Sequence, residues 1–263
     1  MKKSARSMQQ KESVRPQSPV VRSKSTKSQR PHDRINRAGA ETRTKILDAA
    51  ELLFADLSYE GTALRDVSEA AKANIALSIY YFGTKQNLFN AVVARRGAEI
   101  EATRMATLAT IAPTLSAEET IRALVRGYVA PFVEARFSRD PQWVAYANLV
   151  PALVNVRRWI PLTTKLFDKA FRAYIDRFRN ALPEARHNDI LNSFRYMLGA
   201  MVYVCSRSDR FAKDIDPKPA SRQQEMELAM DSLVEYSVGG FLFCATKRRP
   251  TKSKAARETV EQV

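Results

Sequence analysis

The stretch that decides the fold runs from Thr44 to Leu88 and reads TKILDAAELLFADLSYEGTALRDVSEAAKANIALSIYYFGTKQNL. Three helical patterns follow one another in it, with breaks at Gly61, at 72–74 and at 83–84. A long helix, a short helix, a tight turn and a second short helix form the arrangement of a helix-turn-helix DNA-binding unit. The sequence therefore predicts such a unit, followed by a fourth helix.

Apolar residues mark the inner face of the first helix. They recur at helical spacing, as one buried stripe requires: Ile46, Ala49, Ala50, Leu53, Phe54 and Leu57. Asp48 and Glu51 fall on the opposite, polar face. Thr62 is predicted to cap the second helix, because its hydroxyl can accept a hydrogen bond from a free amide of the next turn. The first-turn amides of that helix then face outward, where they could bind a phosphate.

The third helix is predicted to run from Ile75 to about Phe82, with Asn74 as its N-cap. A helix of about two turns is unstable by itself in water. A short helix that its neighbours hold at the surface usually has a role there, and reading a DNA groove is the leading interpretation. Thr84 is predicted to cap the fourth helix.

Three motifs carry a resemblance to a known family: ILDAAELLF at 46–54, GTALRDV at 61–67, and Y-x-F-x-x-K-x-x-L from Tyr80 to Leu88. In this order and spacing, over about fifty residues, they resemble the TetR-type bacterial transcriptional regulators. The segment RYMLGAM at 195–201 is similar to a helix of members that sense apolar ligands. The resemblance implies an all-α fold, with an N-terminal three-helix head and a C-terminal helical domain for ligand binding and dimerisation.

The match departs from the family pattern at three positions. Lys72 stands where the family usually has glycine, because the turn there needs a left-handed backbone; lysine adopts it at a cost of about 1 kcal/mol. Tyr81 stands in place of the usual histidine. Ser78 replaces an inward-facing leucine or valine, with Leu77 and Ile79 on either side. Either the third helix is rotated, or Leu77 and Ile79 face the DNA.

The resemblance implies that Thr62, Tyr80 and Lys85 contact DNA phosphates. Position on the second and third helices adds further DNA-binding candidates: Arg65, Asn74, Ile75, Ala76, Leu77 and Ser78. Asparagine can pair with adenine, and apolar side chains can contact thymine methyl groups. Three simpler interpretations stand beside these: Asn74 only caps its helix, Ile75 belongs to the core, and Lys85 is a solvated lysine.

The positive charge is concentrated at the two ends of the chain. The whole chain carries +15, of which residues 1–40 carry +9 and residues 247–263 carry +4. Both ends are poor in large apolar residues, and we predict a disordered basic arm at 1–40 and a disordered tail at 247–263. The arm could follow DNA phosphates or enter the minor groove. The alternatives are a solubilising tail and a misassigned start codon.

Other features predict a cytoplasmic protein that does not enter a membrane. The arm has no apolar core segment typical of a secretion signal, and the sequence has no run of about eighteen apolar residues. Cys205 and Cys244 both lie in apolar helical patterns, which predicts buried thiols rather than a disulfide or a metal site.

Helical patterns continue to the end of the predicted fold, so we expect a head at 41–88 and a helical domain at 89–246. A capping box at Ser116 and Glu119 opens one helix, and Asp140 opens the next. Pro151 should kink or split that helix. A further helix is predicted from about Pro161 to Leu182.

The last two helices contain heptad-like seams: Ile190, Phe194, Met197, Met201 and Val204, and then Met226, Met230, Leu233, Ser237, Gly240 and Cys244. We expect these seams to form a four-helix interface in a homodimer, because a single reading helix recognises too few bases to be selective. The alternative is that they pack inside one subunit.

A dimer would place two reading helices about one DNA turn apart, on a near-palindromic operator. A small apolar or amphipathic effector, acyl-like or aromatic, would move the fourth helix and spoil this spacing, which releases the repressor. Aromatic residues are the pocket candidates: Tyr128, Trp143, Tyr146, Trp159, Phe167 and Phe171. Ordinary core packing explains the same residues. Arg157 and Arg158 could meet an anionic ligand or be a solvated pair.

We find no sequence pattern for catalysis, a cofactor or a metal site. The chain has two histidines and eight glycines, and no Ser-His-Asp set, carboxylate pair or phosphate-binding glycine loop is evident. An enzyme is therefore not expected. The stronger alternative is a helical ligand-binding or interaction protein whose head has lost specific DNA binding, an idea that the departures at Lys72, Ser78 and Tyr81 motivate.

Overall fold

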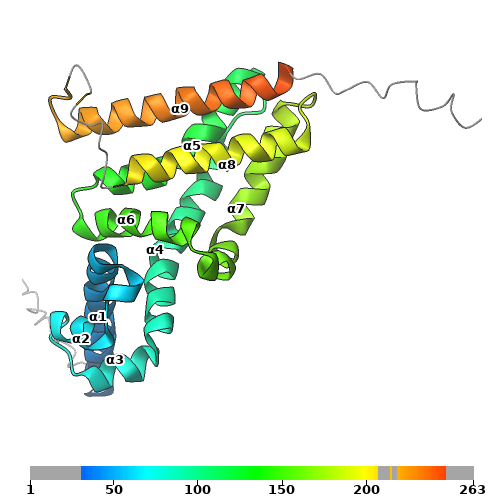
Figure 1. Cartoon of the computed structure of the whole chain (residues 1–263). Helices are drawn as coiled ribbons and strands as arrows, with labels where there is room; N and C mark the ends of the chain where they lie inside the picture. Colours follow the sequence, from blue (N-terminus) through cyan, green and yellow to red (C-terminus); the bar gives the residue numbers. More distant parts are fainter. Residues whose placement is uncertain (1–30, 207–213, 215–217, 247–263) are drawn as a thin grey trace, which may run out of the picture. The chain divides into compact units, whose positions relative to one another are not determined.

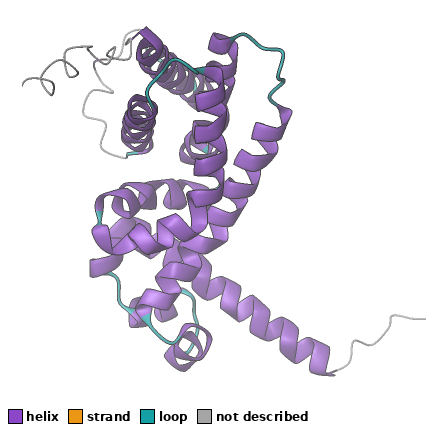
Figure 2. Cartoon of the chain, turned by 90° about the vertical axis from the view of Figure 1, so that its right-hand side faces the viewer, coloured by secondary structure: helices purple, strands orange, loops and turns teal. Residues whose placement is uncertain are grey.

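We describe a computed structural model, which defines residues 31–206, 214 and 218–246. Within these ranges the chain consists of α-helices, one 3-10 helix and short connections, without a β-strand, as the sequence predicted (Figure 2). The helices are α1 (Pro31–Gly61), α2 (Leu64–Ala70), α3 (Ile75–Phe82), α4 (Lys85–Thr110), α5 (Ala117–Phe137), α6 (Pro141–Asn155), η1 (Arg157–Trp159), α7 (Ile160–Ala181), α8 (His187–Cys205) and α9 (Arg222–Thr246).

The chain divides into two compact units, residues 1–39 and 40–263. Of the first unit, the structure describes only the beginning of α1. Residues 31–40 are helical, although the sequence predicted disorder up to residue 40. The predicted disorder at 1–30 and at 247–263 lies outside the described residues. Everything below concerns the second unit.

The predicted helix boundaries hold at most positions. The Asn74 side chain accepts a hydrogen bond from the amide of Ala76, Thr84 caps α4, and Ser116 forms the predicted capping box with Glu119. Asp140 caps α6. Of the two outcomes expected at Pro151, a kink or a split, the split does not occur: α6 continues through it to Asn155.

The long helix α4 runs from the end of α3 into the body, where it packs against α5 and α7 (Figure 1). Glycine permits one of these close approaches. A Cβ atom added at Gly127 on α5 would lie 2.8 Å from the Thr107 side chain of α4 and 3.0 Å from the Tyr174 hydroxyl of α7. These helices therefore meet around a position without a side chain.

Helices α8 and α9 lie side by side, and α9 also packs against α5 (Figure 1). Their predicted seams face inward: Ile190, Phe194, Met197, Met201, Met230, Leu233, Ser237 and Cys244 are all buried within the single chain. The expectation that these residues form the dimer interface is therefore wrong, because α5 and the neighbouring helices of the same subunit already cover them. Of the remaining seam residues, Val204 and Met226 are partly buried and Gly240 is exposed. Cys205 and Cys244 are free and buried, as predicted.

Among the described helices, α9 alone is long and apolar enough to cross a membrane by length and composition. Two acidic residues near its middle form ion pairs at the surface with α5: Glu235 pairs with Arg122 and Asp231 with Arg126. These ion pairs hold α9 against the helical body.

Candidate functional site

The tight turn between α2 and α3 has the backbone geometry of a helix-turn-helix. Lys72 adopts φ 51°, the left-handed conformation that the sequence predicted at this position. The amide of Ala73 donates to the carbonyl of Ser68 at 2.9 Å, which closes the turn. Asn74 then starts α3 by capping the amide of Ala76 at 2.9 Å. The turn thus fixes the direction in which α3 leaves α2.

Ser78 shows which side of α3 faces inward. It is fully buried, and its hydroxyl lies 2.7 Å from the hydroxyl of Ser68 on α2. Phe82, one turn later, is buried as well. The helix is therefore not rotated relative to the family pattern, because a hydrogen bond between two serines takes the place of the usual apolar contact.

The opposite side of α3 is exposed and unusually apolar. Tyr80 is 79% exposed and Ile79 is 51% exposed, and Ile75 and Leu77 are also exposed. Exposed apolar residues in such a group usually mark a binding surface. This outer side of α3, formed by Ile75, Ala76, Leu77, Ile79 and Tyr80, is called the reading face below.

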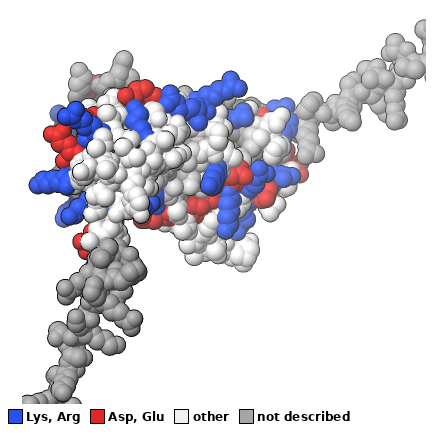
Figure 3. Space-filling view, turned by 90° about the horizontal axis from the view of Figure 1, so that it is seen from below, with Lys and Arg blue, Asp and Glu red and all other residues white. Residues whose placement is uncertain are grey.

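Charged groups of both signs lie around the reading face rather than forming one continuous basic patch. A space-filling view from below shows Lys and Arg interspersed with Asp and Glu around a broad uncharged area (Figure 3). Arg65, in the first turn of α2, is exposed. At the start of the same helix Asp66 accepts a hydrogen bond from the amide of Ala63 at 3.0 Å, so one of the amides predicted to seat a phosphate is already capped.

The structure separates the predicted DNA-binding residues into two groups. Arg65, Asn74, Ile75, Ala76, Leu77 and Tyr80 are exposed on α2, at the turn or on α3. The side chains of Thr62 and Ser78 are buried and face the interior. Thr62 also does not cap α2: its hydroxyl donates to the carbonyl oxygens of Leu53 and Ser58 at the end of α1. The prediction that these two side chains contact DNA is therefore wrong for this conformation, because neither reaches the surface.

Lys85 is neither free nor simply solvated. Its ammonium group donates to the carbonyl oxygens of Tyr59 at 2.9 Å and Thr62 at 3.0 Å, and it lies 4.5 Å from the centre of the Tyr59 ring. A cation at a helix C-terminus satisfies carbonyl groups that have no partner within the helix. Lys85 therefore ties the start of α4 to the end of α1.

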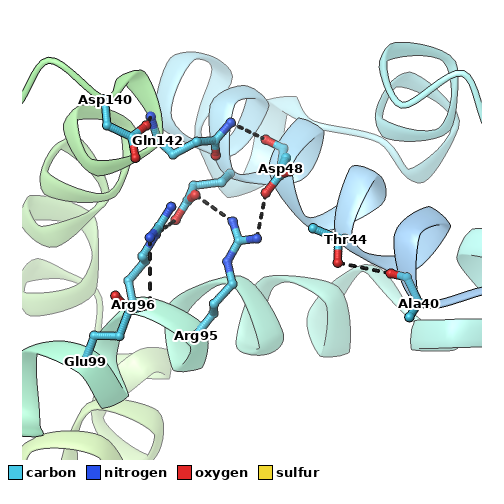
Figure 4. A network of polar contacts seen from close by, with 9 residues as sticks. Ala40, Thr44, Asp48, Arg95, Arg96, Glu99, Asp140 and Gln142 are labelled. Carbon is cyan, nitrogen blue, oxygen red and sulfur yellow. Dashed lines mark hydrogen bonds and ion pairs between the residues drawn. The ribbon is translucent and has the colours of Figure 1, made fainter. Parts of the chain in front are cut away.

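A polar cluster connects α1 to α4 farther along (Figure 4). Arg95 donates to Asp48 at 2.6 Å and to Glu51 at 2.7 Å, and Arg96 lies 3.5 Å from Glu51. Glu51 is completely buried, although the sequence placed it on the polar face of α1. Burial raises the pKa of Glu51, against the opposing effect of the two guanidinium groups. Gln142 of α6 donates to the carbonyl of Asp48 at 3.4 Å, so the cluster also reaches the body.

The body contains a cavity of about 310 Å³. It is lined by residues of α4 to α8: Arg104, Tyr128, Phe132, Leu153, Val154, Thr163, Thr164, Phe167, Asp168, Phe171, Phe194, Leu198 and Met201. Three of the six aromatic pocket candidates, Tyr128, Phe167 and Phe171, are among them. A cavity of this size and apolar character suits a small ligand.

The other three candidates lie elsewhere because each has a different packing role. Trp143 stacks on the Arg96 guanidinium, 4.5 Å from the ring centre. Tyr146 is buried and donates to the carbonyl of Val93 at 3.3 Å. Trp159 is buried beside Phe89, at 4.3 Å between ring centres, where η1 meets the start of α4. The prediction is therefore wrong for this cavity, although Trp143 lines a second one, of about 260 Å³, between α4, α5 and α6.

Arg157 and Arg158 are also outside the cavity, and Arg158 pairs with Glu60 at 3.2 Å. The guanidinium that does line the cavity belongs to Arg104, which the sequence reasoning missed. Its position in the middle of a long amphipathic helix gives no local signal of burial. Only the arrival of α5 and α7 encloses it.

A helix-turn-helix with an exposed third helix, joined by α4 to an all-helical body with a ligand-sized cavity, is the architecture typical of helix-turn-helix regulators with a separate binding pocket. Residues 46–92 match the model of bacterial regulatory proteins of the tetR family, and residues 126–240 match that of a tetracyclin repressor-like C-terminal domain. The chain belongs to the tetR family of helix-turn-helix transcriptional regulators.

Curated proteins similar to this chain in sequence include HTH-type transcriptional regulators. The chain is 33% identical over 105 residues to the HTH-type transcriptional repressor Rv3405c of Mycobacterium tuberculosis, which covers 37% of this chain and 54% of that protein. It is 31% identical over 85 residues to the probable HTH-type transcriptional regulator YttP of Bacillus subtilis, covering 32% and 39%. The chain thus spans about half the length, or less, of the curated relatives it matches.

Solved structures show the same fold. A TetR-like transcriptional regulator from Rhodococcus sp. RHA1 has a TM-score of 0.50 at 18% identity, covering 76% of this chain and 96% of that one. HlyIIR, a hemolysin II transcriptional regulator, also has a TM-score of 0.50, at 20% identity, covering 74% and 98%. At such identities the likeness concerns the fold alone.

Proposed function

We propose that the protein is a ligand-responsive repressor that acts in the cytoplasm and binds a near-palindromic DNA operator as a homodimer. One observation carries the proposal: α3 is held on its inner side by Ser78 and Phe82, while its outer side, with Tyr80, remains open. A major groove admits one helix, and only an exposed helix surface can enter it. The sequence similarity of the chain to HTH-type transcriptional regulators supports the same conclusion.

The reading face favours apolar contacts. Ile75 and Leu77 can meet thymine methyl groups, Asn74 can pair with adenine, and the Tyr80 hydroxyl can donate to a phosphate. Arg65 is placed for a base edge or the backbone. The operator should therefore be rich in A·T pairs where α3 lies. Lys85 contributes indirectly, because it fixes α1 against α4 and so positions α3.

The outer sides of α8 and α9 are the proposed dimer surface, in place of the seams. Tyr196 on α8 and Tyr236 on α9 are each 67% exposed. Gly199, Gly239 and Gly240 have no heavy atom within 4 Å of an added Cβ, so each opens onto free space. Small residues between large aromatic ones permit helices of a second copy to approach closely. The proposed dimer therefore uses the exposed sides of α8 and α9, which include Gly240 of the predicted α9 seam.

Helix α4 is the proposed route from ligand to DNA. One part of it lines the cavity through Arg104, and another part holds α1 through Arg95. A ligand that prefers a shifted α4 would alter the spacing between the two heads of the dimer. A differential affinity worth about 3 kcal/mol changes occupancy roughly a hundredfold.

The test is fluorescence anisotropy with labelled DNA from upstream of the protein's own gene. Tyr80→Ala and Leu77→Ala should each weaken binding by about tenfold or more, since one contact at the DNA surface is worth about 1–3 kcal/mol. Leu115→Ala, an exposed leucine in the α4–α5 connection, is the matched control. Unchanged affinity in both reading-face variants would favour the alternative, a helical ligand-binding or interaction protein without specific DNA recognition.

A further inference from the structure

The cavity of the helical body has predominantly aromatic and aliphatic walls. Its apolar lining includes four phenylalanines, a leucine and a methionine: Phe132, Phe167, Phe171, Phe194, Leu198 and Met201. The cavity has about 310 Å³ of space, near the lower end of the range for small-molecule sites. Such walls favour a hydrocarbon chain or an aryl ring.

One charged group lies deep within these walls. Arg104 is only 2% exposed, yet it lines the cavity. Its Nε donates to the carbonyl of Tyr128 at 2.8 Å, and its Cζ lies 3.6 Å from the centre of the Tyr128 ring. These contacts position the guanidinium, but they do not neutralise its charge.

The guanidinium keeps a free donor. The terminal Nη2 atom of Arg104 is buried without a hydrogen-bond partner, and no described carboxylate forms a salt bridge with it. A buried cation without a counter-charge is costly, whereas a paired one is tolerated. The buried charge of Arg104 therefore lacks a partner, which a bound anion would supply.

Neither Asp168 nor Glu101 forms a salt bridge with Arg104, and each has another partner. Asp168 lines the cavity, but its carboxylate accepts from Arg172 at 2.6 Å and is partly exposed. Glu101, one turn before Arg104 on α4, accepts from the amide of Ala170 at 2.7 Å. The hydroxyl of Thr163 donates to the carbonyls of Trp159 and Ile160, both at 3.1 Å. The second carboxylate oxygen of Glu101 is buried without a hydrogen-bond partner, but Glu101 does not line the cavity. Among the residues that line it, Arg104 is the one with a buried side-chain atom that lacks a hydrogen-bond partner.

We propose that this cavity binds a small amphipathic carboxylate, with its head on Arg104 and its apolar part among the phenyl rings. A guanidinium donates to a carboxylate through strong, charge-assisted hydrogen bonds, and the apolar walls suit the rest of the molecule. The effector is thereby assigned a negative charge as well as an apolar part. The regulatory consequence, a pull on α4, rests on the proposed function.

The experiment compares three probes with the same eight-carbon chain: octanoate, octan-1-ol and octylammonium. In titration calorimetry at pH 7.5 without DNA, octanoate should bind at least about tenfold more tightly than octan-1-ol, and octylammonium should not bind. Arg104→Met should remove the preference for octanoate and leave octan-1-ol binding intact. Arg179→Met, on the outer surface of α7, is the control that should preserve the preference.

A second variant covers the case in which Arg104→Met does not fold. Leu198→Trp fills the cavity while it retains the arginine, and it should abolish octanoate binding. Three results would overturn the proposal: no octanoate binding at millimolar concentration, equal affinity for octanoate and octan-1-ol, or full binding by Leu198→Trp. Because DNA is absent from this titration, a failure of the proposed DNA binding would leave its outcome unaffected, and the reverse also holds.

Discussion

The hydroxyl groups of Ser68 on α2 and Ser78 on α3 lie 2.7 Å apart in the interior of the helix-turn-helix. Ser68 also donates to the carbonyl of Leu64 at 2.8 Å. A hydroxyl has one proton to donate, so Ser78 must be the donor to Ser68. The orientation of the reading face thus depends on a directional polar contact rather than on apolar packing alone.

We predict that the Ser68 and Ser78 hydroxyl groups stabilise the fold as a coupled pair. Ser68→Ala should lower the free energy of unfolding by about 1 kcal/mol or more, because the Ser78 hydroxyl then loses its buried acceptor. Urea unfolding of Ser68→Ala, Ser78→Ala and the double variant measures the coupling. The double variant should cost less than the two single costs combined. Simple additivity would show that the two hydroxyls do not stabilise each other.

Lys85→Met should destabilise the protein by roughly 2 kcal/mol, since the carbonyls of Tyr59 and Thr62 lose a charged donor. Thermal unfolding checks this, with Lys45→Met, an exposed lysine on α1, as the control with little effect. A role limited to contact with DNA predicts the reverse: unchanged stability in both variants, with DNA affinity lost in Lys85→Met alone.

Lys72→Gly should stabilise the turn by up to about 1 kcal/mol. The residue has φ 51°, and glycine adopts that conformation without the steric cost that a side chain brings. Lys72→Ala retains the Cβ atom and separates this backbone effect from the loss of charge. If alanine and glycine give the same melting temperature, the left-handed backbone costs nothing at this position.

Glu51→Ala should destabilise the fold by about 3 kcal/mol or more, because it leaves Arg95 and Arg96 facing a buried site without their carboxylate. Asp48→Ala is the comparison: its side chain is half exposed, and its pair with Arg95 should contribute less than about 1 kcal/mol. Chemical denaturation measures both. Equal costs would show that burial of the cluster contributes nothing.

The Cys205 thiol should be unreactive in the folded protein. Burial raises its pKa to about 12, and its Sγ faces the carbonyl of Phe132 at 3.6 Å. In a Cys244→Ser background, alkylation by iodoacetamide at pH 8.5 should be slow in buffer and fast in denaturant. Since the pKa is raised by folding, this thiol's contribution to stability is complete below about pH 9 and declines as the pH rises toward 12. Rapid alkylation of the folded protein would contradict its burial.

Local patterns predicted the elements of this fold well. Caps such as Asn74 and Thr84 act within a few residues of their own position. The left-handed backbone at Lys72 was expected from the family resemblance, because the family usually has glycine at that position. Long-range placement was less predictable. The seam residues of α8 and α9 have the spacing of an interhelical contact, but spacing does not state whether the partner helix belongs to the same subunit.

The same limit explains the site residues. Their aromatic character suggested a pocket wall for Trp143, Tyr146 and Trp159. In the structure each contacts a different neighbour, namely the Arg96 guanidinium, the Val93 carbonyl and the Phe89 ring, respectively. The family motif suggested phosphate contacts for Thr62 and Lys85. In the structure both donate hydrogen bonds to backbone carbonyl groups at or just after the end of α1. In each case the residue type was informative, while its partner came from a distant part of the chain.

The amino-acid sequence alone determined the helices, the turn and the family, since hydrophobic period, capping and backbone preference are properties of neighbouring residues. The tertiary structure alone decided which side of α3 is open, which aromatic rings enclose the cavity, and that Arg104 is buried there without a counter-ion. The physical reason is that burial and charge pairing depend on groups brought together from separate helices, which no local pattern records.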